Sequence, residues 1–426
     1  MKWSGQVLIK GLIFVFVLLL LWPAIHNLTS GNDFDIFLRA AYSLSDGKEI
    51  YNNSYVNGLY YYYSPLFIWF LQPFTYFKDI VLNNSVVNNI PLSFFLVKAT
   101  WNVFMFFLIY RIIKIVNGIF KFESNKGKFI FYLVCFVLCY RWFFLNIWYG
   151  QLTIFILWTI LESFLNNAKN TVTRWAPFSL AVNIKIIPML MFWKLILDKD
   201  WKFILRSVIW LAVFLIIPFI FYPFNYMLEQ NIHWLQLINP VQKTHIITIG
   251  EGGFIDIGAI VVKYFTNYEI PTEPTICISE LSHTAIFVIT QFWRLLIFGL
   301  VIWLYLFIRN SKHIFRPDFL SISLFCAAIP LIFPHQRDYS LALLIPAVCY
   351  VVYMFTNQLF SMNAIMSAMF FVALELMGCV FFYEMFSLDF RHWVIGVRLQ
   401  GIGAIVFFFT FAAFIYQYQA YPEDDN

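Results

Sequence analysis

Long apolar runs alternate with short polar segments along the whole chain. A transmembrane helix needs roughly 20 mostly apolar residues, whereas a barrel strand gives ~10-residue segments of alternating polarity. The apolar runs here are long and continuous, so they predict an all-α polytopic membrane protein. We place spans near residues 8–26, 92–116, 129–147, 152–167, 203–222, 284–308, 317–333, 340–357, 362–385 and 400–418.

One further apolar stretch, residues 171–198, is interrupted by Lys185 and Pro188. It predicts either one broken span or two short helices that enter the membrane and return. Broken helices at membrane depth are tolerated where they face protein or a wet cavity. We therefore expect about 10–12 transmembrane helices, forming a single integral membrane domain over residues 1–426.

Lysines and arginines in short loops set the expected orientation. They gather before the first span and in the segments 111–128, 194–206 and 309–316, which we assign to the cytoplasm together with both termini. The opposite face then receives the first long loop (27–91), the second long loop (223–283) and the turn 334–340. Loops on a rigid scaffold often carry function. We therefore expect the active face to be extracytoplasmic, in a bacterial inner membrane.

The composition supports a membrane protein and argues against other classes. Charged residues make up 12% of the chain, against about 25% in a soluble protein. The net charge of +5 is ordinary for a membrane protein and indicates no nucleic-acid partner. The chain has no HExxH motif, clustered Cys/His spacing, P-loop or GxGxxG motif. The sequence therefore predicts neither a metal nor a nucleotide cofactor for the reaction.

The first long loop has predicted structure of its own. The segment "FDIFLRAAYSLS" follows the candidate N-caps Ser30, Asn32 and Asp33 and runs to Gly47, which suits the C′ position of a helix. The later segment "YYYYSPLFIWFLQPF" (residues 60–74) has the Tyr and Trp content of a membrane interface, with Pro65 suited to a first helical turn. It predicts an interfacial helix lying in the membrane plane.

Two carboxylates, Asp33 and Asp35, lie at the head of the first predicted loop helix. Asp33 has two compatible interpretations. It is a helix N-cap, or a permanently ionised carboxylate that accepts a proton from a hydroxyl. Asp35 is two residues further on and does not share a helix face with Asp33. We therefore expect Asp33 to be the base and Asp35 to be a helix-face or solvated neighbour, with at most a substrate contact.

Three later segments carry candidate binding groups, each with a structural alternative. Lys185 in "NIKIIP" is a charge partner for a phosphate, or it snorkels from a helix end. Gln151 in "YGQLT" hydrogen-bonds a sugar or caps a helix. His335 and Arg337 in "FPHQRDYS" donate to a phosphate, or they belong to a solvated loop with an internal Arg337–Asp338 pair.

Taken in chain order, these segments resemble the motifs of one family. They are an acid soon after the first span ("DFDIF" then "LRAA", with Asp33 at the acid position), "YSPLF" (residues 63–67), the pair Gly150–Gln151, "KIIP" (residues 185–188) and "PHQRDYSLALLIPA". Over about residues 5–350 the chain resembles the GT-C class of membrane glycosyltransferases. Within that class it resembles glycosyltransferase family 87, the polyprenyl-phosphate-mannose-dependent α-mannosyltransferase type.

The resemblance implies a GT-C-like helical fold with short interfacial helices in the extracytoplasmic loops. It implies an inverting, metal-independent transfer of a hexose such as mannose from a polyprenyl-phosphate donor. The acceptor would be a hydroxyl of a glycolipid or glycan, and no cofactor is implied. Asp33 would be the general base. Lys185, His335 and Arg337 would hold the leaving phosphate. The full set of substrate-binding candidates is Asp35, Tyr63, Ser64, Gln151, Lys185, His335 and Arg337.

Two other functions stay open at this point. A secondary transporter would explain the interrupted stretch and its lysine, although no internal repeat is visible. An enzyme of the O-antigen ligase or polymerase type would rely on Arg and His in a late loop, and Asp33 would then be incidental. Loss of activity on changing Arg337 but not Asp33 would favour this last function.

Overall fold

The computed structural model describes residues 5–56, 58–82, 90–165, 172–239, 253–267, 273–311, 313–359, 362–380, 383 and 386–418. Residues 240–252 and 268–272 of the predicted second long loop lie outside the described residues. The chain divides into two compact units, which we describe separately. The first unit comprises Met1–Phe16, Val116–Phe143 and Pro240–Asn426, and the second comprises Val17–Ile115 and Phe144–Asn239. A single integral membrane domain stays a prediction.

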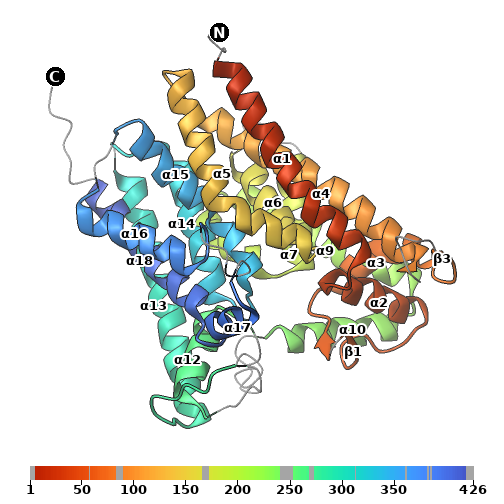
Figure 1. Ribbon diagram of the computed structural model, residues 1–426. Coiled ribbons are helices and arrows are strands. Elements are labelled where there is room, and N and C mark those ends of the chain that lie inside the picture. The colour runs from red at the N-terminus through yellow and green to blue at the C-terminus, as the bar shows by residue number, and fades with distance from the viewer. Residues whose placement is uncertain are drawn as a thin grey trace. The chain divides into compact units, whose positions relative to one another are not determined.

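Helices make up nearly all of the regular structure in both units (Figure 1). In the described part of the chain, seven helices are long and apolar enough to cross a membrane: Gln6–Thr29, Leu92–Ile119, Asn125–Trp148, Trp201–Phe221, His283–Asn310, Asp338–Thr356 and Leu399–Tyr418. Four shorter apolar helices are Thr153–Leu165, Ile187–Leu197, Pro317–Ile332 and Ala364–Leu376. Each predicted span coincides with or overlaps one of these helices, so the prediction of an all-α integral membrane protein is confirmed.

The second unit contains the first long loop and the helices around it. Its elements are the later part of α1 (Gly5–Thr29), α2 (Asp33–Ser45), β1 (Ser54–Val56), β2 (Leu59–Tyr60), α3 (Pro65–Thr75), β3 (Val81–Leu82), β4 (Ile90–Pro91), most of α4 (Leu92–Ile119), the end of α5 (Asn125–Trp148), α6 (Thr153–Leu165), α7 (Val172–Ile184), the 3-10 helix η1 (Ile187–Leu190), α8 (Met191–Leu197), α9 (Trp201–Phe221) and α10 (Phe224–Leu237). The strands form two short antiparallel pairs, β1 with β2 and β3 with β4. Helix α2 packs on α3, and α3 also contacts α7, α9 and α10.

The first unit is built around α14 (Pro317–Ile332). Its other elements are most of α5, α12 (Ile257–Phe265), α13 (His283–Asn310), the 3-10 helix η2 (Asp338–Leu344), α15 (Ile345–Thr356), α16 (Ala364–Leu376), α17 (Leu388–Gly396) and α18 (Leu399–Tyr418). Helix α14 packs against α13, α15, α18 and η2, and every residue from Phe319 to Leu331 is buried. A helix that is apolar on all sides is buried on all sides.

Helix α2 begins one residue after its cap, and the cap is Asn32. The Asn32 side chain accepts a hydrogen bond from the backbone N–H of Phe34 at 3.0 Å. Asp33 is therefore the first helical residue and not the N-cap, so its carboxylate is left for other partners. The other end follows the prediction. Gly47 has φ +66°, and the N–H groups of Gly47 and Lys48 bond the carbonyls of Leu44 and Ser43, which closes the helix as a Schellman motif.

The predicted interfacial helix is α3, which starts with Pro65 at its first position as expected. The interrupted stretch 171–198 forms two helices, α7 and α8 preceded by η1, and Lys185 lies at the break between α7 and η1. Pro188 falls inside η1, since it cannot donate the hydrogen bond needed to continue α7.

The span predicted over 362–385 is too long. Helix α16 ends at Leu376, because Gly378 adopts the left-handed conformation (φ +71°) that turns the chain out of the helix. The N–H groups of Gly378 and Cys379 bond the carbonyls of Glu375 and Leu374, which is again a Schellman closure. The apolar sequence beyond Gly378 misled the prediction, since hydropathy alone does not report a left-handed glycine.

Candidate active site

A chain of hydrogen bonds joins three predicted site residues in the second unit. Gln151 donates from Nε2 to Asp33 Oδ2 at 2.7 Å. Gln151 Oε1 in turn accepts from the Tyr63 hydroxyl at 3.0 Å. The Gln151 amide is thus held at both ends, and its donor side is directed at the carboxylate. The sequence left helix capping as an alternative role for Gln151. The Gln151 side chain instead bonds Asp33 and Tyr63 and caps no helix.

The end of α5 explains why Gln151 reaches Asp33. Gly150 adopts φ +66°, and the N–H groups of Gly150 and Gln151 bond the carbonyls of Ile147 and Asn146. This Schellman closure turns the chain directly toward α2. A Cβ on Gly150 would lie 2.8 Å from the Cβ of Phe34, so only glycine allows this close approach. The Gly-Gln pair therefore works as a unit, with the glycine placing the glutamine.

Lys185 brings a cation to the same cluster. Its Nζ lies 5.3 Å from the centre of the Tyr63 ring, in a cation–π contact. Lys185 belongs to none of the seven span-length helices. Burial lowers the pKa of Lys185 to about 8, and the carboxylate of Asp33 opposes that shift. The ammonium is therefore close enough to Asp33 for the two charges to interact, and it stays charged at neutral pH.

Ser64 anchors the segment that carries Tyr63. Its Oγ lies 3.2 Å from Asn183 Oδ1, and its backbone N–H bonds the carbonyl of Ile184 at 3.2 Å. The Tyr61 hydroxyl donates to the Ser64 carbonyl at 2.8 Å. Ser64 is 1% exposed, so its contacts tie the "YSPLF" segment to the end of α7, one residue before Lys185.

Exposure separates the cluster into two groups. Gln151 and Tyr63 are buried, at 1% and 6% exposure, whereas Asp33 and Lys185 remain partly exposed. A buried amide and phenol therefore support one accessible carboxylate and one accessible ammonium. Such a pair can accept a proton on one side and neutralise an anion on the other. Substrate contacts for Tyr63, Ser64 and Gln151 stay a prediction.

Asp35 lies in a different environment from Asp33. It is 9% exposed, and its Oδ1 lies 2.6 Å from Lys98 Nζ of α4. Lys98 also donates to the Ser30 carbonyl at 2.7 Å. The ion pair therefore joins α4 to the turn that starts α2, and Asp35 is not solvated. Its predicted substrate contact stays a prediction.

Several supporting residues were missed by the sequence analysis. Lys98 interrupts an apolar span, and an intramembrane charge signals a partner or a site, so this lysine could have been found. Asn32 Nδ2 donates to the Trp148 carbonyl at 3.1 Å, and Asn27 Nδ2 donates to the Ile147 carbonyl at 2.5 Å. These two bonds join the last turn of α1 and the α1–α2 turn to the end of α5, and no sequence pattern predicts them.

His335 and Arg337 belong to the first unit. Their turn pairs with a short segment before α12, in which Phe254 forms a β-bridge with Arg337 and the Arg337 guanidinium lies 5.6 Å from the Phe254 ring centre. Asp338 lies 3.6 Å from Arg141 of α5, a buried arginine that the sequence analysis did not single out. His335 adopts φ +59°, a left-handed conformation that non-glycine residues rarely adopt. Phosphate binding by His335 and Arg337 stays a prediction.

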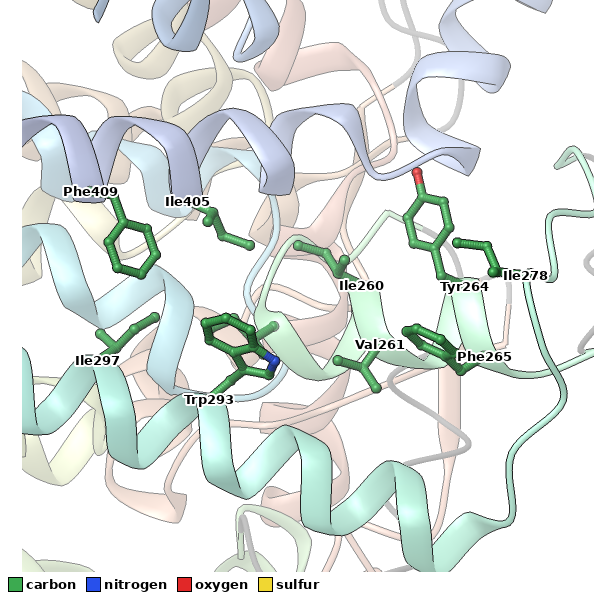
Figure 2. A pocket seen from close by; sticks show the side chains of 10 residues that line it. Ile260, Val261, Tyr264, Phe265, Ile278, Trp293, Ile297, Ile405 and Phe409 are labelled. Atoms are coloured by element: carbon green, nitrogen blue, oxygen red, sulfur yellow. The ribbon is translucent and has the colours of Figure 1, made fainter. Parts of the chain in front are cut away.

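An apolar groove of about 410 Å³ lies in the first unit between α12, α13 and α18 (Figure 2). Its lining residues are aliphatic or aromatic: Ile257, Ile260, Val261, Tyr264, Phe265, Ile278, Trp293, Ile297, Ile405 and Phe409. The Tyr264 hydroxyl donates to the Val397 carbonyl at 2.9 Å, so this polar atom is already engaged. The groove fits hydrocarbon and offers little for a sugar to bind.

The chain matches the profile described as "Glycosyltransferase family 87" over residues 61–334. This match covers well over half of the sequence. The chain belongs to glycosyltransferase family 87. Tyr63, Ser64, Gln151 and Lys185 lie inside the matched segment, whereas Asp33 and Asp35 precede it and His335 and Arg337 follow it. The protein is therefore a membrane glycosyltransferase, and the transporter hypothesis is not supported.

Two solved structures of ArnT from Cupriavidus metallidurans, one in the apo state and one bound to undecaprenyl phosphate, align with the chain. Both alignments cover 96% of this chain and 78% of ArnT, with 13% sequence identity and a TM-score of 0.37. Values this low establish no shared activity. No curated protein gives a significant match to the chain.

The Asp35–Lys98 pair generates a prediction about stability. Removing one partner of a buried ion pair leaves an uncompensated charge and costs about 3–5 kcal/mol. We expect Lys98→Met and Asp35→Asn each to lower the free energy of unfolding by roughly this amount. The double variant should recover part of the loss, since no unpaired charge remains. Unfolding of the purified protein in detergent measures all three variants.

The exposed pair Lys48–Asp46, with its atoms 3.0 Å apart, provides the control. Lys48→Met should leave the unfolding transition nearly unchanged, because exposed ion pairs contribute little. Losses from Lys98→Met and Asp35→Asn that simply add in the double variant would contradict the coupling.

Proposed function

We propose that this enzyme transfers a hexose, and specifically mannose, from a polyprenyl-phosphate donor to an acceptor hydroxyl. The transfer inverts the configuration at the anomeric carbon. The observation that carries the proposal is the Asp33 carboxylate, which Gln151 holds by a hydrogen bond and which is close enough to the Lys185 ammonium for the two charges to interact. An inverting transfer needs a base for the attacking hydroxyl and positive charge for the leaving phosphate. Both groups are present in one cluster on adjoining segments.

In the proposed reaction, Asp33 removes the proton of the acceptor hydroxyl as its oxygen attacks the anomeric carbon. The bond between that carbon and the phosphate oxygen breaks on the opposite face of the sugar, and its electron pair leaves with the lipid phosphate. Lys185 stabilises the charge that grows on the phosphate. The products are the glycosylated acceptor, the lipid phosphate and a protonated Asp33.

A lipid-linked donor is supported by the family resemblance and by the apolar groove of the first unit. Helix α13 exposes Phe292 and Leu295 at 60% and 67%, as expected for side chains that face lipid, and Trp293 of the same helix lines the groove. We propose that the extracytoplasmic face of a bacterial inner membrane carries the reaction, because the basic loops assign the acidic first loop to that side. The acceptor would be a glycolipid or glycan.

The base assignment predicts a large loss of transfer in Asp33→Asn. General-base catalysis typically contributes about 10²–10⁴-fold, and we expect a loss of that size in the transfer of labelled sugar from polyprenyl-phosphate donors. Asp389→Asn is the matched control, since Asp389 is an exposed carboxylate in the first turn of another helix, α17. It should keep full activity.

Full activity of a folded Asp33→Asn variant would refute Asp33 as the base. If Asp33→Asn keeps its activity and a separate Arg337 variant loses transfer, the ligase or polymerase type of reaction would be favoured. Failure of the wild-type protein to use any polyprenyl-phosphate donor would overturn the proposed donor class.

Lys185 predicts a pH dependence. Its lowered pKa, about 8, means that the ammonium is present below that pH and is lost above it. If the charged form stabilises the leaving phosphate, kcat/KM should fall as the pH rises through about 8. Lys185→Arg should retain activity above this pH, because arginine stays protonated. Lys185→Met should be slow throughout and lack this limb. An alkaline limb that is identical in wild type and Lys185→Met would contradict the role.

A further inference from the structure

Three side chains that can ligate a metal converge in the second unit, outside the Asp33 cluster. Glu49 lies in the turn after α2, and Glu229 and His233 lie on α10. One ligand atom from each lies within 4.8 Å of the other two. Glu229 and His233 are four residues apart, so they share a face of the helix. The set therefore combines two carboxylates and one imidazole from two separate elements.

Glu49 is oriented by its neighbours. Gln230, which is 1% exposed, donates from Nε2 to Glu49 Oε2 at 3.0 Å. The Tyr51 backbone N–H donates to Glu49 Oε1 at 3.2 Å, and His233 Nδ1 lies 3.1 Å from the same oxygen. Hydrogen bonds of this kind orient metal-binding carboxylates in proteins. The carboxylate is thus fixed on the side that faces α10.

The charges of the cluster do not balance. With a neutral imidazole, Glu49 and Glu229 place two negative charges close together, and like charges at this distance repel. The nearby ammonium of Lys48 is paired with Asp46. A divalent cation would neutralise the cluster.

We propose that Glu49, Glu229 and His233 form a binding site for a divalent transition-metal cation of the Zn²⁺ class. The imidazole nitrogen favours Zn²⁺ over Ca²⁺ and Mg²⁺, which prefer oxygen ligands only. Three protein ligands leave one position of a tetrahedral site for water. Ligands about 2.0–2.2 Å from one ion lie at most ~4.4 Å apart, and Glu229, which is exposed, can rotate to close the remaining gap.

The site would clamp α10 to the turn that follows α2. Besides the hydrogen bonds of Gln230 and His233 with Glu49, two more join these segments: Ile50 N–H to Gln230 Oε1 at 3.1 Å, and the Tyr226 hydroxyl to the Lys48 carbonyl at 2.6 Å. A bound cation would add a further link through metal–ligand bonds. This role is independent of the proposed transfer reaction, whose steps use no metal.

The test uses the full-length protein, purified in detergent, stripped with a chelator and then titrated with ZnCl₂. We expect about one Zn²⁺ per chain by elemental analysis, with a thermal unfolding midpoint that rises on Zn²⁺ addition. Glu229→Gln and His233→Ala should abolish both effects. Gln230→Leu, which removes the orienting amide, should weaken Zn²⁺ affinity about 10–100-fold.

The exposed carboxylate Glu280, which lies in the first unit, gives the control variant Glu280→Gln, and it should bind Zn²⁺ as the wild type does. Glu229→Gln separates the site from a simple Glu49–His233 ion pair, because it leaves that pair intact. Unchanged Zn²⁺ binding in Glu229→Gln would overturn the proposal. So would no Zn²⁺ binding by the wild type, or a stabilisation by CaCl₂ equal to that by ZnCl₂.

Discussion

The hydrogen bond from Gln151 to Asp33 joins two of the chain segments that build the candidate site. Asp33 opens α2, and Gln151 follows the glycine that ends α5. The bond can form because Gly150 lets the two backbones approach and because Asn32, rather than Asp33, caps α2. A carboxylate at a helix start is stabilised in its ionised form by the helix dipole. The helix start and Gln151 thus stabilise the Asp33 carboxylate while it stays partly exposed.

The remaining charges of the second unit are arranged around this constraint. Asp35 is neutralised by Lys98, so only Asp33 remains as an accessible carboxylate at the start of α2. Lys185 stays partly exposed beside Tyr63, where the aromatic ring lowers the cost of holding a cation in apolar surroundings. The buried charges of Asp35 and Lys98 are paired with each other. Asp33 and Lys185 remain partly exposed, and they are the charges that the proposed chemistry uses.

The sequence predicted much of this fold because helix starts and stops obey local rules. Pro65 and Gly47 marked a helix start and end correctly, since their backbone preferences act without tertiary contacts. Asn32 and Asp33 are both good caps, and tertiary contacts distinguish them: Asn32 donates to the Trp148 carbonyl, and Asp33 accepts from Gln151. The same limit applies to Lys98 with Asp35 and to Glu49 with His233, whose partners lie 63 and 184 positions apart. Pairings over such separations depend on tertiary structure that no local pattern encodes.

We propose that Gln151 acts on the reaction through Asp33, and a double-mutant comparison of the two residues tests this dependence. Single-turnover transfer of labelled sugar would be compared for wild type, Asp33→Asn, Gln151→Leu and the double variant. We expect Gln151→Leu to slow transfer in the wild-type background but to add no further loss when Asp33 is already replaced, because the effects of residues that act as a unit are not additive. Rate losses that multiply in the double variant would show that Gln151 acts independently of Asp33.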